Sequence, residues 1–136
     1  MQLGAFDSAR DWGSAVDYAH VIPQTLELDT PQDFIFATGK ETTVGEFLRL
    51  GAEVAGFSPE FEGEGQSMTC RDTKSGQVLA IVSPQYFRPF DTPPLIGNPT
   101  LLKQATSFAG SRDISTIAEE MVNTDIQRRA NGMIHV

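Results

Sequence analysis

The chain has 136 residues, of which 18 are acidic and 10 are basic, so its net charge is −8, and 40% of its residues are hydrophobic. This composition is typical of a globular protein with a real apolar core, and the length predicts a single domain over residues 1–136. An acidic surface repels phosphate backbones and anionic lipid, so we expect neither nucleic acid nor a membrane as a partner. An anionic ligand would have to be held by a few well-placed arginines.

The sequence also limits the cellular setting. Its only cysteine, Cys70, excludes an internal disulfide and a cysteine-based zinc site, and this favours a reducing cytoplasm. No run of eighteen apolar residues occurs, and the first residues lack a basic region followed by an apolar stretch. We therefore expect a cytoplasmic protein with no signal peptide and no membrane span.

The first half of the chain predicts two helices and a strand. Residues 14–28 show roughly helical apolar spacing, although Pro23 should kink or restart the helix. Residues 33–39, DFIFATG, form a short run typical of a buried strand that ends at a glycine. Thr43 and Glu46 then form a capping-box pattern in front of a second helix, which should end at Gly56.

The second half predicts a hairpin and two further helices. Residues 60–82 look extended, with a turn at residues 73–76. Several prolines make the following stretch irregular, and a short helix should start at Pro99. The last helix should begin at about Ile114, capped by Asp113. Its expected apolar face comprises Ile114, Ile117, Met121, Val122 and Ile126.

Most common catalytic patterns are missing from the sequence. No glycine-rich strand-to-helix turn for a dinucleotide is present, and the histidines, His20 and His135, offer no convincing base for a serine or cysteine nucleophile. We expect Cys70 to be a core or hairpin residue rather than a reactive thiol. Glutamates 60, 62 and 64 alternate along one run and could meet a divalent cation, but a solvated strand face is the better interpretation.

Two arginines have surroundings suited to an anion. Arg10 lies beside the chain's only tryptophan, and Arg88 lies in PQYFRPFD between aromatic residues and prolines. A guanidinium group binds phosphate oxygens through a bidentate fork, and aromatic neighbours restrict its rotamers. The alternative is ordinary ion pairing, of Arg10 with Asp7, Asp11 or Asp17 and of Arg88 with Asp91, and residue chemistry alone favours this alternative.

Five motifs, in order, resemble GDP-mannose 4,6-dehydratases. LGAFDSARDWGSAVDY resembles the family's LGNLDAKRDWGHAKDY, and PQDFIFATGKETTVGEFL resembles P-x-D-[FY]-[VI]-x-A-T-G followed by S-V-R-E-F-V. VSPQYFRP resembles V-D-P-R-Y-[FY]-R-P, IGNPT resembles L-G-D-P-T, and AEEMVNTDI resembles R-E-M-V-x-x-D-L. The matches run from about Leu3 to Ile126, and the combination of RDWG, ATG and YFRP is fairly specific to this branch of the extended short-chain dehydrogenase/reductases.

The resemblance covers only the family's C-terminal third. It implies an α/β fold, α+β-like in arrangement, that forms the substrate-binding portion of such an enzyme without its Rossmann domain. Intact members bind NADP in that domain, which also carries the catalytic Thr/Ser, Glu and Tyr-x-x-x-Lys groups. Neither tyrosine here starts such a motif, because Ile22 follows Tyr18 and Phe90 follows Tyr86 at the lysine position. We therefore expect no catalytic residue, no metal site and no cofactor site in this chain.

The family's substrate contacts map onto three residues. By resemblance, Arg10 and Arg88 would bind the diphosphate of a GDP-sugar, and Asp91 would accept hydrogen bonds from the ribose hydroxyls. The resemblance therefore favours ligand binding by Arg10 and Arg88, whereas residue chemistry alone favoured ordinary ion pairs. The sequence departs from the family pattern at Ala9, Ser14, Pro23 and Asn98, and in the segment RPFDTPP.

Three functions follow as hypotheses. The chain could be a fragment or split half that binds GDP-mannose for a dehydratase completed by a separate Rossmann half, a non-catalytic GDP-sugar-binding or regulatory module, or a decayed remnant that self-associates. GDP-mannose or GDP should bind weakly.

The sequence also predicts self-association. Without a Rossmann domain, Phe34, Phe36 and apolar residues of the first helix should lose their cover. We therefore expect a homo-oligomer with an interface within about residues 14–55.

Overall fold

The computed structural model describes residues 1–133, and these group into two compact units. The first unit comprises residues 1–8, 43–92 and 115–133, and the second comprises residues 9–42 and 93–114. Each unit is therefore assembled from segments that are distant in the sequence. The expectation of a single domain over residues 1–136 stays a prediction.

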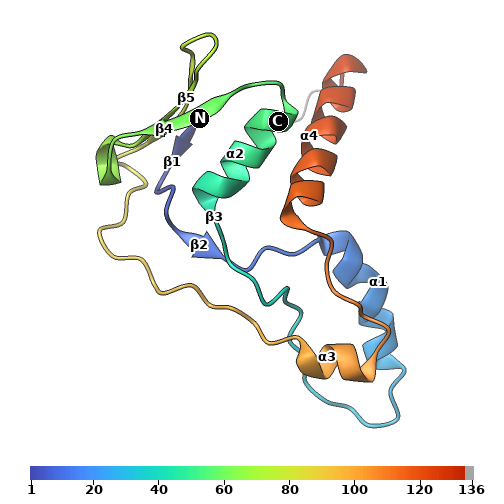
Figure 1. Cartoon of the computed structure of the whole chain (residues 1–136). Coiled ribbons are helices and arrows are strands. Elements are labelled where there is room, and N and C mark those ends of the chain that lie inside the picture. The colour runs from blue at the N-terminus through green and yellow to red at the C-terminus, as the bar shows by residue number, and fades with distance from the viewer. Residues whose placement is uncertain (134–136) are drawn as a thin grey trace. The chain divides into compact units, whose positions relative to one another are not determined.

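The first unit is built on a four-stranded mixed sheet (Figure 1). Its strands are β1 (Gln2–Leu3), β4 (Pro59–Glu62), β5 (Thr69–Asp72) and β6 (Val78–Val82), in the spatial order β1-β6-β5-β4. Strands β4, β5 and β6 are antiparallel neighbours, and β1 is parallel to β6 with Gln2 opposite Ile81. The hairpin expected within residues 60–82 is confirmed, with a short 3-10 helix, η1 (Gly65–Ser67), between β4 and β5.

The turn between β5 and β6 is organised by a buried carboxylate. Asp72 accepts hydrogen bonds from the hydroxyl and backbone N–H of Ser75, at 2.6 and 2.9 Å, and from the backbone N–H of Ser58 at 2.7 Å. The Ser75 hydroxyl, followed by the Ser58 amide, lowers the pKa of Asp72 to about 2. Gly76 closes the turn with a φ of 71°, a conformation that glycine adopts without strain.

Helix α2 (Val44–Val54) is capped by the expected residue, Thr43, whose hydroxyl accepts a hydrogen bond from the Glu46 N–H at 3.0 Å. The second contact of a capping box, from the Glu46 carboxylate back to a backbone amide, was wrongly predicted. The Glu46 carboxylate binds Arg49 one turn later, at 2.6 and 2.8 Å, because a charged guanidinium is a stronger partner than a backbone amide. The helix ends before Gly56, which has a φ of 90°.

Small and aromatic residues form the core of the first unit. Cys70 and Ala80 are completely buried on neighbouring strands, and Phe6 and Val82 complete the cluster. The rings of Phe6 and Phe61 meet edge to face with centroids 5.3 Å apart. Burial raises the pKa of the Cys70 thiol, so the structure confirms a core residue rather than a reactive nucleophile.

Helix α4 (Ile114–Ala130) starts where the sequence predicted, but its expected apolar face is only partly buried. A methyl carbon of Val122 lies close to Gly51 of α2, and α4 runs beside α2 in Figure 1. Ala118 is the buried residue of the helix, whereas Met121 and Ile126 are each about half exposed. The apolar spacing therefore did not predict burial at these two positions.

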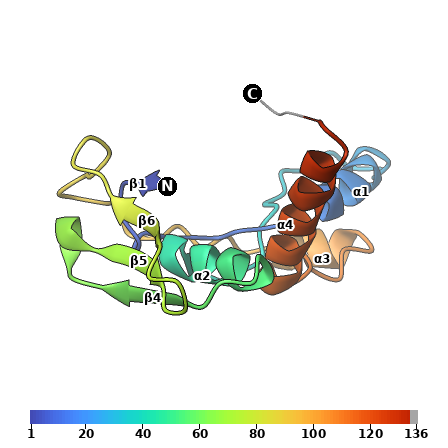
Figure 2. The ribbon, with the colours of Figure 1, turned by 90° about the horizontal axis from the view of Figure 1, so that it is seen from above.

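The second unit contains α1 (Ala15–Leu26), α3 (Thr100–Ala105) and β2 (Ala9–Arg10), while β3 (Thr42–Thr43) spans the boundary between the units. Figures 1 and 2 both show α1 and α3 side by side. Ser14 caps α1 by accepting a hydrogen bond from the Asp17 N–H, and the helix continues through Pro23 without restarting. Helix α3 follows Pro99, as predicted.

The strand expected at residues 33–39 does not form. This segment has no ladder partner in the described part of the chain. Phe34 and Phe36 instead pack against Val21, Leu102 and Phe108 within the second unit. Both phenylalanines are partly buried by this packing, so the expectation that they would be uncovered was also wrong. Within residues 1–133, no helix is long and apolar enough to cross a bilayer.

Leu102 should be the most sensitive position in the second unit. It is fully buried, whereas the adjacent Leu101 is 46% exposed, so the pair separates burial from helix propensity. We expect Leu102→Ala to lower the free energy of unfolding by about 2 to 5 kcal/mol and Leu101→Ala by less than about 1 kcal/mol. Urea denaturation monitored by circular dichroism measures both variants, and equal losses would contradict the assigned core.

Candidate functional site

The loop after β2 is held by the carboxylate of Asp11. Its Oδ1 accepts hydrogen bonds from the backbone N–H and the hydroxyl of Thr38, the former at 2.8 Å. Its Oδ2 accepts from the N–H groups of Gly39 and Gly97, at 3.0 and 3.1 Å. One side chain therefore joins three segments of the second unit that are far apart in the sequence.

The ionised form of Asp11 is favoured by this arrangement. Partial burial alone would raise the pKa of the carboxyl, but the hydrogen bonds from Thr38, Gly39 and Gly97 outweigh burial and lower it. A carboxylate that accepts several N–H bonds is a strong and directional anchor. Asp11 is thus structural, and it is not the ion-pair partner that the sequence offered for Arg10.

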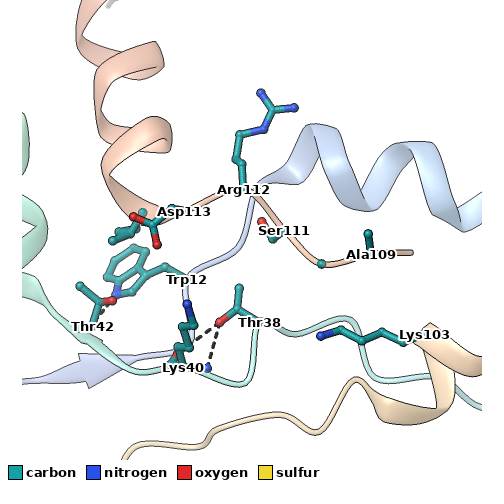
Figure 3. Close-up of a pocket in the computed structure, with 11 residues that line it drawn as sticks. Trp12, Thr38, Lys40, Thr42, Lys103, Ala109, Ser111, Arg112 and Asp113 are labelled. Carbon is teal, nitrogen blue, oxygen red and sulfur yellow. Dashed lines mark hydrogen bonds between the residues drawn. The ribbon is translucent and has the colours of Figure 1, made fainter. Parts of the chain in front are cut away.

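Trp12 and Gly13 continue the loop. The indole N–H of Trp12 donates to the carbonyl oxygen of Thr42 at 2.9 Å, so the ring is fixed to the chain that follows Thr38 (Figure 3). A Cβ at Gly13 would clash with the hydroxyl of Tyr18, so glycine is needed for this close approach. Tyr18 in turn packs against Phe36 and Phe108, each with ring centroids 5.9 Å apart.

A second set of polar contacts ties the start of α1 to the segment before α4. Asp17 forms a salt bridge with Arg112 at 2.6 Å and also accepts from the Arg112 N–H at 2.7 Å. The Arg112 hydrogen bonds lower the pKa of Asp17. Ser111 Oγ accepts from the Ser14 N–H at 2.8 Å. Asp17 therefore pairs with Arg112, which removes the second carboxylate offered for Arg10.

The three residues proposed from the sequence are all exposed. Arg10 belongs to the second unit, where its Nη1 donates to the carbonyl of Ala9 at 2.6 Å. Arg88 and Asp91 belong to the first unit, and Asp91 accepts from the Thr92 N–H at 2.9 Å. Arg88 forms no ion pair with any carboxylate among residues 1–133, so the alternative of an Arg88–Asp91 pair was wrong.

The second unit also contains a pocket of about 200 Å³ that sequence reasoning missed. It is lined by Trp12, Thr38, Lys40, Thr42, Lys103, Ala109, Gly110, Ser111, Arg112, Asp113 and Ile114. Each of these residues belongs to the second unit. No sequence signal connects Lys40 with Lys103, because the loop and α3 that carry them are joined only through the fold.

Metal-binding chemistry has no candidate cluster. Within the described residues, no three His, Cys, Asp or Glu side chains come close enough to hold an ion. Glutamates 60, 62 and 64 are exposed, which confirms the solvated strand face. His135 lies outside the described residues.

Comparison with known proteins gives one consistent family. The family model described as GDP-mannose 4,6 dehydratase matches residues 1–121. The chain is 36% identical to GDP-mannose 4,6-dehydratase from Yersinia enterocolitica, over 94% of this chain and 37% of that protein. It is 35% identical to GDP-mannose 4,6 dehydratase 2 from Caenorhabditis elegans, over 93% of this chain and 33% of that protein.

The human GDP-mannose 4,6 dehydratase is 32% identical over 92% of this chain and 34% of its own length. The chain thus spans little more than a third of the length of these relatives. The family match covers the Asp11 loop, the pocket and the segment containing Arg88 and Asp91.

Asp11 should be more important for stability than its exposed neighbour Asp7. Asp11→Ala leaves four donors without their acceptor, so we expect it to lower the free energy of unfolding by about 1.5 to 3 kcal/mol. Asp7→Ala, at an exposed position, is the matched control and should be close to neutral. Urea titration followed through Trp12 fluorescence measures the difference, and a neutral Asp11→Ala would contradict the anchoring role.

Proposed function

Because the chain belongs to the GDP-mannose 4,6-dehydratase family, we propose that it supplies the GDP-sugar-binding part of a dehydratase that converts GDP-mannose to GDP-4-keto-6-deoxymannose. The observation that carries the proposal is the family match over residues 1–121, which includes every residue of the candidate site. Arg10 and Arg88 bind the diphosphate, and Asp91 accepts hydrogen bonds from the ribose hydroxyls.

The surroundings of these residues support their assigned roles. Arg88 carries no counter-charge among residues 1–133, so a ligand phosphate would not have to displace an existing salt bridge. A guanidinium binding a phosphate in a bidentate manner adds both energy and orientation.

The described residues do not fit an NADP site. The first unit's sheet is mixed and mostly antiparallel, and no glycine-rich turn joins a strand to a long helix as dinucleotide binding requires. Hydride transfer needs a bound cofactor and a catalytic base, and we assign both to a Rossmann half. In the proposal, this chain binds and orients the nucleotide sugar, and a separate Rossmann half performs the chemistry.

The same proposal extends to association. Val16, Ile22 and Leu26 are exposed apolar side chains on α1, with Leu26 at 81%. Exposed apolar groups of this kind are typical of association surfaces. We therefore propose that the segment 14–55 contacts either a Rossmann half or a second copy of the chain, with α1 in place of Phe34 and Phe36 as the apolar element.

The purified chain should have no dehydratase activity with GDP-mannose and NADP. Addition of a Rossmann half from a family member should produce 4-keto product, detected by mass spectrometry. Arg88→Ala in this chain should then raise KM more than it lowers kcat, because the residue acts in binding. Turnover by the chain alone would contradict the proposal, and continued inactivity with a stable complex would favour a non-catalytic binding module.

GDP should bind weakly, because few charge-assisted contacts must offset the entropy of association. Isothermal calorimetry should give a dissociation constant of about 0.1 to 1 mM. We expect Arg10→Ala and Arg88→Ala each to weaken binding about tenfold. Arg129→Ala, near the end of α4, is the control and should leave the isotherm unchanged. Identical isotherms for Arg88→Ala and the parent would remove that residue from the site.

Light scattering at micromolar concentration should show a dimer or larger assembly of the chain alone. Leu26→Ser should shift this equilibrium toward the monomer, because the change removes a large exposed apolar side chain from α1. Leu95→Ser, at a residue that is 86% exposed but outside residues 14–55, is the matched control. A stable monomer for the parent would contradict self-association, including the hypothesis of a decayed self-associating remnant, and would favour a module with a separate partner.

A further inference from the structure

We propose that the pocket around Trp12, Lys40 and Lys103 is a binding site for a small phosphate-bearing molecule. The proposal does not rest on the proposed function, because Arg10, Arg88 and Asp91 do not line this pocket. Its volume of about 200 Å³ is below the range of about 300 to 1,000 Å³ for pockets that take drug-sized ligands. The occupant is therefore small.

The charge of the lining favours an anion. Three basic residues, Lys40, Lys103 and Arg112, line a pocket that has one acidic lining residue, Asp113. These four side chains sum to +2, and the sum is still +1 when Asp17, the partner of Arg112, is included. The net charge of the whole chain is −8. A positive pocket on an acidic protein attracts anions against the overall field.

The two lysines are available for a ligand. Within residues 1–133, neither ammonium group forms a salt bridge or a hydrogen bond. Figure 3 shows the ends of Lys40 and Lys103 on either side of Thr38, while the Arg112 side chain points away from them. Arg112 is paired with Asp17. Each ammonium group sits on a flexible four-carbon stem and carries three donors, so both can turn toward one phosphate group.

Several residues of the pocket lining also carry uncharged donors. The backbone N–H groups of Ala109, Gly110 and Ser111 donate no hydrogen bond to any residue of the described chain, and the Thr42 hydroxyl is likewise unbonded there. Phosphate oxygens accept hydrogen bonds from groups of both kinds. These residues can therefore add neutral hydrogen bonds to the two charged contacts of the lysines.

Both walls of the pocket are fixed by contacts already described. Asp11 and the Trp12 indole hold residues 38–42, and Asp17 and Ser14 hold residues 111 and 112. Such preorganisation reduces the entropy lost when a ligand binds. The indole supplies an apolar surface for the carbon part of a phosphate ester, so the pocket suits a phosphorylated small molecule better than free phosphate.

Trp12 is the chain's only tryptophan, so its fluorescence reports on this pocket. The full chain is titrated with inorganic phosphate and with glycerol 3-phosphate, and sodium chloride at matched ionic strength is the salt control. We expect a saturable change with both phosphates and none with chloride. Tighter binding of the ester would identify an organic ligand, whereas equal binding would identify free phosphate as sufficient.

Substitutions test which residues carry the effect. Lys40→Gln and Lys103→Gln should each weaken phosphate binding about tenfold, since each removes one charge-assisted contact. Lys74→Gln, in the exposed turn between β5 and β6, is the matched control and should bind like the parent. Lys103→Arg keeps the charge and should retain binding within about threefold, which separates loss of charge from loss of fold.

A linear response in the parent, or equal binding by Lys40→Gln, Lys103→Gln and Lys74→Gln, would overturn the proposal. Calorimetry with GDP distinguishes this outcome from failure of the nucleotide-sugar site. The pocket variants should bind GDP like the parent, and Arg88→Ala should bind inorganic phosphate like the parent. Loss of both ligands in a pocket variant that folds normally by circular dichroism would also overturn a separate phosphate site.

Discussion

The second unit depends on one carboxylate. Asp11 follows directly after Arg10 and accepts hydrogen bonds from Thr38, Gly39 and Gly97, so it fixes the loop that carries the arginine to two other segments. Leaving a partly buried backbone N–H without an acceptor costs about 1 to 3 kcal/mol. These hydrogen bonds therefore contribute more to the stability of the fold than an exposed ion pair does. Asp11 therefore holds the loop that carries Arg10 and does not serve as the ion-pair partner of that arginine.

The contacts of the Asp11 loop account for the residue types in the RDWG motif. Each residue after the arginine makes a specific contact in the described structure. The aspartate anchors three segments, the indole of Trp12 donates to Thr42, and Gly13 leaves room for the Tyr18 hydroxyl. The motif therefore fixes the loop that carries Arg10. Trp12 of the same motif also lines the pocket to which Lys40 contributes.

Local patterns in the sequence predicted the local structure well. Thr43, Gly56 and Pro99 marked helix boundaries correctly because their capping and backbone preferences act within a few residues. The hairpin and the burial of Cys70 followed for the same reason. Phe34 and Phe36 were misread as strand residues because alternation records which side chains are buried and not whether the backbone has a ladder partner.

The candidate site was less predictable. Arg10, Arg88 and Asp91 came from a family resemblance, and the structure adds that they are exposed and that Arg88 lacks an ion-pair partner among residues 1–133. The Asp17–Arg112 pair and the lysine-lined pocket could not be read from the sequence, because their members are brought together only when the second unit folds. Spacing along a chain carries no information about contacts of this kind.

The most direct measurement of the central claim is a nitrogen-15 amide spectrum of the full chain during titration with GDP. The account predicts saturable shifts for the amides around Arg10 and for residues 86–92, which surround Arg88 and Asp91. Amides of the turn at residues 73–76 should stay in place and serve as the internal reference. Shifts confined to other segments, or no saturable shift up to about ten times the expected dissociation constant, would contradict the assignment of this chain as a GDP-sugar-binding module.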